Sequence, residues 1–147
     1  MPINENTNVS DTISNPSHYE KASVTIQIQP IDLVRHLSFC LGNVLKYLFR
    51  APYKGSEIQD LKKAHQYLLW YIEDGQYLYD MEQIKEHKYI VNIFRKDIKD
   101  KYLKDKRLAI ITCILSSFLT RDISLANSLT NDAINLYNYI LEVESKC

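Results

Sequence analysis

Four polar side chains recur at helical spacing in one apolar segment. If residues 31–51 form a single helix, His36, Asn43 and Arg50 recur at intervals of seven, and Lys46 lies one turn from the latter two. Most other residues of this segment are apolar, which is typical of a central helix. A cation on such a helix needs an acidic partner or an anionic ligand, because an unpaired buried charge is costly. We therefore expect this stripe to bind an anion.

A second helix is expected directly after this one. Ser56 followed by Gln59 matches a capping box, so a helix is predicted over residues 57–74, with Gly75 as its end. The short segment between the two helices makes an antiparallel helix hairpin the expected arrangement. On the second helix, polar and aromatic side chains and one small residue, Ala64, share one face at spacings of three and four: Asp60, Lys63, Ala64, Tyr67 and Tyr71.

Any phosphate group must be held by side chains in this protein. The chain has only three glycines and no G-x-x-x-x-G-K-[ST] sequence, so a P-loop is excluded. Arginine offers phosphate a planar fork of donors, and lysine a movable point charge. The candidate phosphate-binding residues are Lys46, Arg50, Lys54 and Lys63. Asp60 is placed to orient Arg50, and Tyr67 to stack on a base.

A purely structural interpretation of the same residues stays open. Arg50 and Asp60 can form an ion pair between the two helices, and Lys46 can extend to water. Two features favour a ligand instead. Cations outnumber acidic residues from Arg35 to Lys63, and several tyrosines lie among them.

The N-terminal region is expected to be less regular. Residues 1–14 are predicted to form a flexible arm. Residues 23–29 alternate apolar and polar side chains up to Pro30, the pattern of a short strand or extended arm. His18 and Tyr19 precede this segment and could fold over the helix hairpin, which would bring the imidazole to a phosphate or base.

The rest of the chain is predicted to be helical. Four segments have helical apolar patterns: residues 76–87, 89–102, 108–119 and 123–143. We therefore predict an all-α fold, a helical bundle around the central hairpin. The expected organisation is an arm (1–14), a core (15–75) and additional C-terminal helices that pack on the core or form an oligomer interface (76–147). A lone strand and a small hairpin both need a partner surface, so we expect a homo-oligomer.

Composition narrows the class of protein. Eighteen basic and eighteen acidic residues cancel, which makes nucleic acid an unlikely partner. No apolar run approaches the length of about 20 residues that a membrane span needs. The three cysteines form no CxxC pair and follow no signal peptide, so a reducing cytoplasm is expected. No histidine or cysteine spacing matches a metal site, and none is predicted.

The ordered set of motifs resembles a known family. The segments are PSHY within residues 15–19, GNVLKYLFRA at 42–51, Lys54, and DLKKAHQY at 60–67. Together they resemble a phage-encoded family of small proteins, often described as of unknown function or as nucleotide kinases without a P-loop. The resemblance covers about residues 15–73. It implies a phage or prophage origin, hence a bacterial host cytoplasm, and phosphorylation of deoxynucleoside monophosphates with ATP and magnesium.

The resemblance also implies a site. Its residues are His18, Tyr19, Asn43, Lys46, Arg50, Lys54, Asp60 and Lys63, with Lys46, Arg50 and Asp60 as the catalytic candidates and Tyr67 or Tyr19 against the base. One departure is Pro52-Tyr53, where relatives usually have glycine and a polar or basic residue.

Two other functions stay open. One is a non-catalytic nucleotide sponge that sequesters host immune signalling nucleotides, linear or cyclic, as an anti-defence protein. The other is an interaction protein whose added helices bind a host protein.

Overall fold

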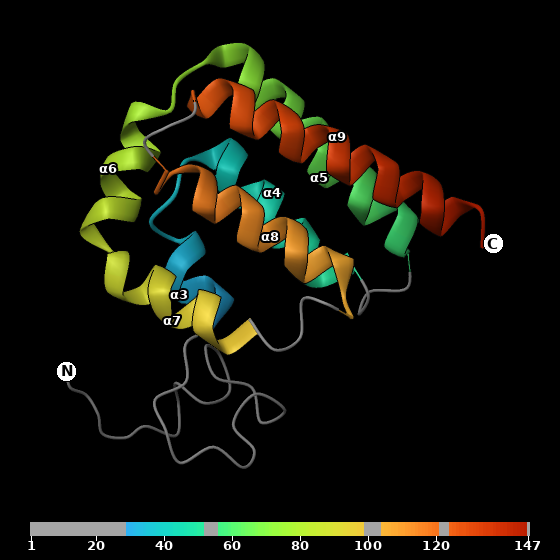
Figure 1. The fold of residues 1–147 in the computed structure, drawn as a ribbon, viewed down its shortest axis with the longest axis horizontal. Coiled ribbons are helices and arrows are strands. Elements are labelled where there is room, and N and C mark those ends of the chain that lie inside the picture. Colours follow the sequence, from blue (N-terminus) through green and yellow to red (C-terminus); the bar gives the residue numbers. More distant parts are fainter. Residues whose placement is uncertain (1–28, 52–55, 99–103, 121–123, 147) are drawn as a thin grey trace, which may run out of the picture.

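The described part of the chain is entirely helical. The computed structural model describes residues 29–51, 56–98, 104–120 and 124–146, and these ranges contain helices but no strand (Figure 1). The helices are α3 (Pro30–Val34), α4 (Phe39–Arg50), α5 (Glu57–Asp74), α6 (Leu78–Glu86), α7 (Lys88–Ile98), α8 (Lys106–Ser117) and α9 (Leu125–Glu144). The all-α prediction is confirmed. The predicted arm, and the predicted strand up to its last residue, lie outside the described residues.

Four helices enclose the main core. In the order α4, α5, α9 and α8, each helix contacts the next, and α8 returns to α4 (Figure 1). The predicted antiparallel hairpin is the α4–α5 pair. Leucine and isoleucine side chains from all four helices fill the interior without exposure, among them Leu45, Leu61, Ile111 and Leu136. The shorter helices flank this bundle, with α3 against α4 and α7, and α7 against α6 and α8.

The single helix expected over residues 31–51 is wrong. The chain leaves the helix after α3, turns, and enters α4 from Ser38, whose backbone is extended (φ −63°, ψ 166°). The Ser38 backbone N–H donates to Asp80 Oδ1 at 2.7 Å and its hydroxyl donates to Asp80 Oδ2 at 2.6 Å. This buried carboxylate fixes the start of α4. His36 lies in the turn and does not share the stripe of Asn43 and Arg50.

The bounds predicted for the second helix are confirmed. α5 begins at Glu57 and ends before Gly75, whose φ of +66° is the left-handed conformation that glycine adopts without strain. The hydrogen-bonded capping box is not present, because the Ser56 side chain caps no backbone N–H. The four later helical segments are also found, with ends shifted by a few residues.

Both ends of α4 are held by buried charged groups from later in the chain. At the N-terminal end, Asp80 is fully buried and also accepts a hydrogen bond from the Tyr71 hydroxyl at 2.7 Å. Burial and this carboxylate raise the pKa of Tyr71 far above its ordinary value. An anion at a helix N-terminus offsets the partial positive charge of its free N–H groups.

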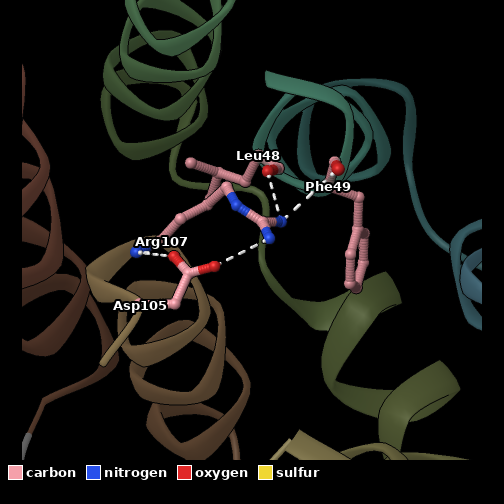
Figure 2. Close-up of polar contacts among 4 residues, drawn as sticks. All are labelled: Leu48, Phe49, Asp105 and Arg107. Atoms are coloured by element: carbon pink, nitrogen blue, oxygen red, sulfur yellow. Dashed lines mark hydrogen bonds and ion pairs between the residues drawn. The ribbon is translucent and has the colours of Figure 1, made fainter. Parts of the chain in front are cut away.

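At the C-terminal end of α4, Arg107 supplies the opposite charge. Its Nη1 donates to the carbonyl oxygens of Leu48 at 2.9 Å and Phe49 at 3.4 Å, and its Nη2 donates to Asp105 Oδ2 at 3.0 Å (Figure 2). A cation here complements the carbonyl end of the helix dipole. α4 is therefore positioned from both ends by residues of the C-terminal half.

No helix within the described ranges has the length and apolarity needed to cross a membrane.

Candidate functional site

Three cations surround one tyrosine ring on the outer faces of α4 and α5. Lys46 Nζ lies 4.7 Å from the Tyr47 ring centroid, Arg50 Cζ 4.9 Å and Lys63 Nζ 5.5 Å. All three lie within the ~6 Å range of a cation–π contact. We call Lys46, Arg50 and Lys63 the cationic end of the site. It concentrates positive charge where the C-terminal half of α4 meets the N-terminal half of α5.

Aromatic rings continue from Tyr47 along the same two helices. The Tyr67 ring stacks on Tyr47 with centroids 6.0 Å apart and planes 14° apart. Phe39 and Trp70 each meet Tyr67 edge to face, at 5.7 Å and 5.5 Å between centroids. Phe39 is 74% exposed and Trp70 is 48% exposed. We call Phe39, Tyr67 and Trp70 the aromatic end. Phe39 is one of the apolar residues that the sequence placed on a central helix, but its ring lies at the surface and not in the core.

Arg50 is the member of the cationic end that is fixed in place. Its Nε donates to Asp60 Oδ2 at 3.2 Å and its Nη2 donates to Asp60 Oδ1 at 3.0 Å. These hydrogen bonds hold the pKa of Arg50 above its ordinary value. Asp60 is buried, so this is the ion pair between helices considered from the sequence, in the geometry expected of an orienting carboxylate. Both Asp60 oxygens are occupied, which fits orientation of Arg50 better than proton transfer.

Lys46 and Lys63 differ from Arg50 in having no carboxylate partner among the described residues. Both are exposed, and neither takes part in an ion pair between described residues. An exposed ammonium group close to a second and a third cation gains from an anionic ligand. These two lysines are therefore the side chains most available to bind phosphate.

Of the remaining residues predicted for the site, the structure describes only Asn43. Asn43 lies on α4 between Phe39 and Lys46, and its Nδ2 donates to the Phe39 carbonyl oxygen at 2.8 Å. His18, Tyr19 and Lys54 lie outside the described residues, so their place in the site stays a prediction. The structure thus brings together Lys46, Arg50, Asp60, Lys63 and Tyr67.

Sequence reasoning missed the two residues that join and extend this cluster. Tyr47 is central to it, and its position three residues before Arg50 in the α4 pattern was a usable signal. Trp70 follows Tyr67 by three residues, so helical spacing placed it on the neighbouring surface.

The described residues offer little for a metal ion. Within the described ranges, no group of three or more histidine, cysteine, aspartate or glutamate side chains comes together. Asp60 is the carboxylate beside the cations, and its oxygens already accept from Arg50. A magnesium ion would fit here only with its ligands supplied mainly by phosphate oxygens and water, as is common for this ion.

Comparison with known proteins connects the first part of the chain to a family. Residues 13–69 match the model of a family described as protein of unknown function, DUF3310. The match includes α3, α4, most of α5 and the cationic end, whereas Trp70, Asp80 and Arg107 lie beyond it. No curated protein and no solved structure matches the chain.

Proposed function

We propose that this chain is a nucleotide-binding protein whose site crosses the outer faces of α4 and α5. The observation that carries the proposal is the arrangement of the cationic end beside the aromatic end, with Tyr47 between them. A nucleotide has the same two parts, a charged phosphate chain and a flat base. Phosphate oxygens would bind Lys46, Arg50 and Lys63, while the base stacks on the exposed rings of the aromatic end.

Both the aromatic end and the cationic end would contribute favourably to the free energy of nucleotide binding. Stacking of a base on an aromatic side chain contributes ~1–3 kcal/mol. Arg50 is held by Asp60 before the ligand arrives, so less side-chain entropy is lost on binding. Lys46 and Lys63 exchange repulsion among neighbouring cations for attraction to phosphate.

The reaction that we propose for this site is phosphoryl transfer from ATP to a nucleoside monophosphate. An oxygen of the acceptor phosphate forms a bond to the γ-phosphorus of ATP, and the bond from that phosphorus to the bridging oxygen breaks. The products are ADP and a nucleoside diphosphate. Lys46, Lys63 and Arg50 would stabilise the charge on the transferring group, with Asp60 as a positioning residue. Magnesium, when bound to the triphosphate, would neutralise part of its charge.

Support for this reaction comes from the sequence resemblance to phage nucleotide kinases without a P-loop, together with the side-chain cations. The acceptor is a phosphate that is already ionised near pH 7, so no general base is needed at Asp60. His18, Tyr19 and Lys54 remain candidates for contacts to the second nucleotide.

A second candidate function is sequestration of a signalling nucleotide without reaction, as a phage anti-defence protein. One observation favours it. A kinase holds a donor and an acceptor together, whereas the described residues present one aromatic end, enough for one base.

One experiment separates the two functions. The protein is incubated with ATP, magnesium and each deoxynucleoside monophosphate, then denatured, and the released nucleotides are identified by mass spectrometry. A new diphosphate, absent with Lys46→Ala/Lys63→Ala and present with Lys96→Ala on α7, is the expected result. Absence of a diphosphate with every acceptor would exclude the kinase, and release of an unchanged nucleotide would then support sequestration.

A further inference from the structure

The two helices of the proposed nucleotide site repeat one arrangement in opposite directions. On α4, Phe39 and Lys46 are seven residues apart, and on α5, Lys63 and Trp70 are seven residues apart. Because α4 and α5 are antiparallel, the two rings lie at one end of the surface and the two ammonium groups at the other. A spacing of seven residues is about 10 Å along a helix axis. On both helices, therefore, a middle section separates the aromatic end from the cationic end.

Asn43 occupies the middle section on α4. It follows Phe39 by four residues and precedes Tyr47 by four, so the three share one face of the helix. The Tyr67 ring of α5 contacts both neighbours, with its centroid 5.7 Å from that of Phe39 and 6.0 Å from that of Tyr47. Asn43 lies between these two contacts and is half-buried. Its side chain is therefore placed beside Tyr67, between the two ends of the site.

A hydrogen bond orients the side-chain amide of Asn43. Its Nδ2 donates to the Phe39 carbonyl oxygen at 2.8 Å, which occupies the donor end of the amide. Its Oδ1 accepts no hydrogen bond from a described residue. An amide oxygen has two lone pairs and accepts from N–H or O–H groups. The middle section therefore presents a hydrogen-bond acceptor that is already oriented and still available.

The surroundings of this acceptor carry no formal charge. Residues 40–45 on α4 and 64–69 on α5 include no lysine, arginine, aspartate or glutamate. Their one histidine, His65, contacts Tyr137 of α9 and so belongs to another side of α5. A phosphate group gains nothing from an uncharged acceptor, because its own oxygens are acceptors too. A neutral hydroxyl group, which can donate, suits this position.

We propose that Asn43 binds the sugar of the nucleotide, with its Oδ1 accepting a hydrogen bond from a ribose or deoxyribose hydroxyl group. The proposal rests on the proposed nucleotide binding and adds a residue that determines specificity. In a nucleotide the sugar joins the base to the phosphate chain. A ligand with its base on the aromatic end and its phosphates at the cationic end therefore has its sugar at the middle section. A site that pairs with a hydroxyl group discriminates against an analogue that lacks it.

The test compares ATP with 2′,3′-dideoxy-ATP, which has neither sugar hydroxyl group, by titration calorimetry of the full chain. We expect the wild type to bind ATP about fivefold more tightly, the usual contribution of one hydrogen bond. Asn43→Leu should bind both nucleotides with equal affinity. Asn92→Leu on α7 is the matched control, because Asn92 is also an asparagine on a helix surface. It should keep the preference of the wild type.

Circular dichroism establishes that each variant is folded, and Asn43→Ala replaces Asn43→Leu if the leucine variant unfolds. A merely structural role of Asn43 would weaken binding of both nucleotides by the same factor. A preference for ATP that the Asn43 variant retains would therefore overturn the inference, and so would equal binding of the two nucleotides by the wild type. Both outcomes leave the proposed nucleotide binding in place. Binding of neither nucleotide by the wild type would overturn the proposed ATP site together with the inference.

Discussion

Helix α4 carries charge in two very different surroundings. At its ends, Asp80 and Arg107 are buried and hydrogen-bonded to backbone and side-chain groups of the bundle. On its outer face, Lys46 is exposed beside Lys63, with no carboxylate paired to either among the described residues. The first pair determines where α4 lies, and the second has unused binding capacity. Charge on a central helix is therefore not by itself a sign of a ligand site.

Arg50 lies between these two cases. It forms a hydrogen-bonded ion pair with the buried Asp60, as a structural residue does, yet its guanidinium also faces Tyr47 beside Lys46 and Lys63. The comparison predicts that substitutions at the ends of α4 change stability, that those on its outer face change binding, and that Arg50 affects both.

The largest effect is expected at the ends of α4. Arg107→Met should lower the free energy of unfolding by about 3 kcal/mol, because it leaves the Leu48 carbonyl oxygen without its buried donor and removes a buried, paired charge. Arg35→Met, at an exposed arginine, should change it by less than about 0.5 kcal/mol. Urea unfolding measures both. Equal effects of the two substitutions would contradict a special role for Arg107.

A smaller, pH-dependent effect is expected at Asp132 between α8 and α9. Desolvation raises the pKa of Asp132 from 3.8 to about 6, although a hydrogen bond from Ser117 opposes the shift. Between these pH values the folded protein keeps a proton that the unfolded chain has released, so this residue lowers stability as pH rises. At pH 8 the loss amounts to about 2–3 kcal/mol.

Asp132→Asn removes this titration and retains a side chain of similar shape. We expect it to raise the free energy of unfolding at pH 8 and to have little effect at pH 4, measured by chemical unfolding at both values. A variant that is destabilised equally at the two pH values would show that the effect of the substitution does not depend on the titration of Asp132, and would contradict the raised pKa.

The smallest of these effects concerns the aromatic end. Tyr67→Ala should weaken nucleotide binding by about 1 kcal/mol, or about fivefold, because a stacking surface is lost. Tyr67→Phe keeps the ring and should bind as the wild type does. Titration calorimetry with ATP distinguishes the two. Loss of binding with both variants would indicate that the hydroxyl group, and not the ring, makes the contact.

The fold could be predicted where local sequence decides it. The limits predicted for α5 are found at Ser56 and Gly75: Gly75 ends the helix in the left-handed conformation, whereas Ser56 precedes it without the capping hydrogen bond that the sequence predicted. The break between α3 and α4 could not be predicted in this way. It depends on the buried Asp80, a residue forty-two positions after Ser38 that periodicity cannot relate to it.

The candidate site, like the fold, could be predicted from the sequence only in part. Spacing of three and four residues placed Asp60, Lys63 and Tyr67 on one face of α5, and the expected hairpin allowed Asp60 to meet Arg50 on α4. Spacing could not show that Tyr47 is the ring around which three cations gather, because this depends on how closely α4 and α5 pack. Hydrophobicity alone also does not distinguish an outward ring, such as that of Phe39, from a buried one.

The most direct test of the proposed site is whether Lys46 and Lys63 are needed to hold a nucleotide. Native mass spectrometry of the wild type with a mixture of linear and cyclic nucleotides, followed by denaturation and identification of what is released, measures this. We expect a bound nucleotide on the wild type and on Lys96→Ala, and its loss from a folded Lys46→Ala/Lys63→Ala protein. The same nucleotide on the double variant, or none on the wild type, would contradict the proposed site.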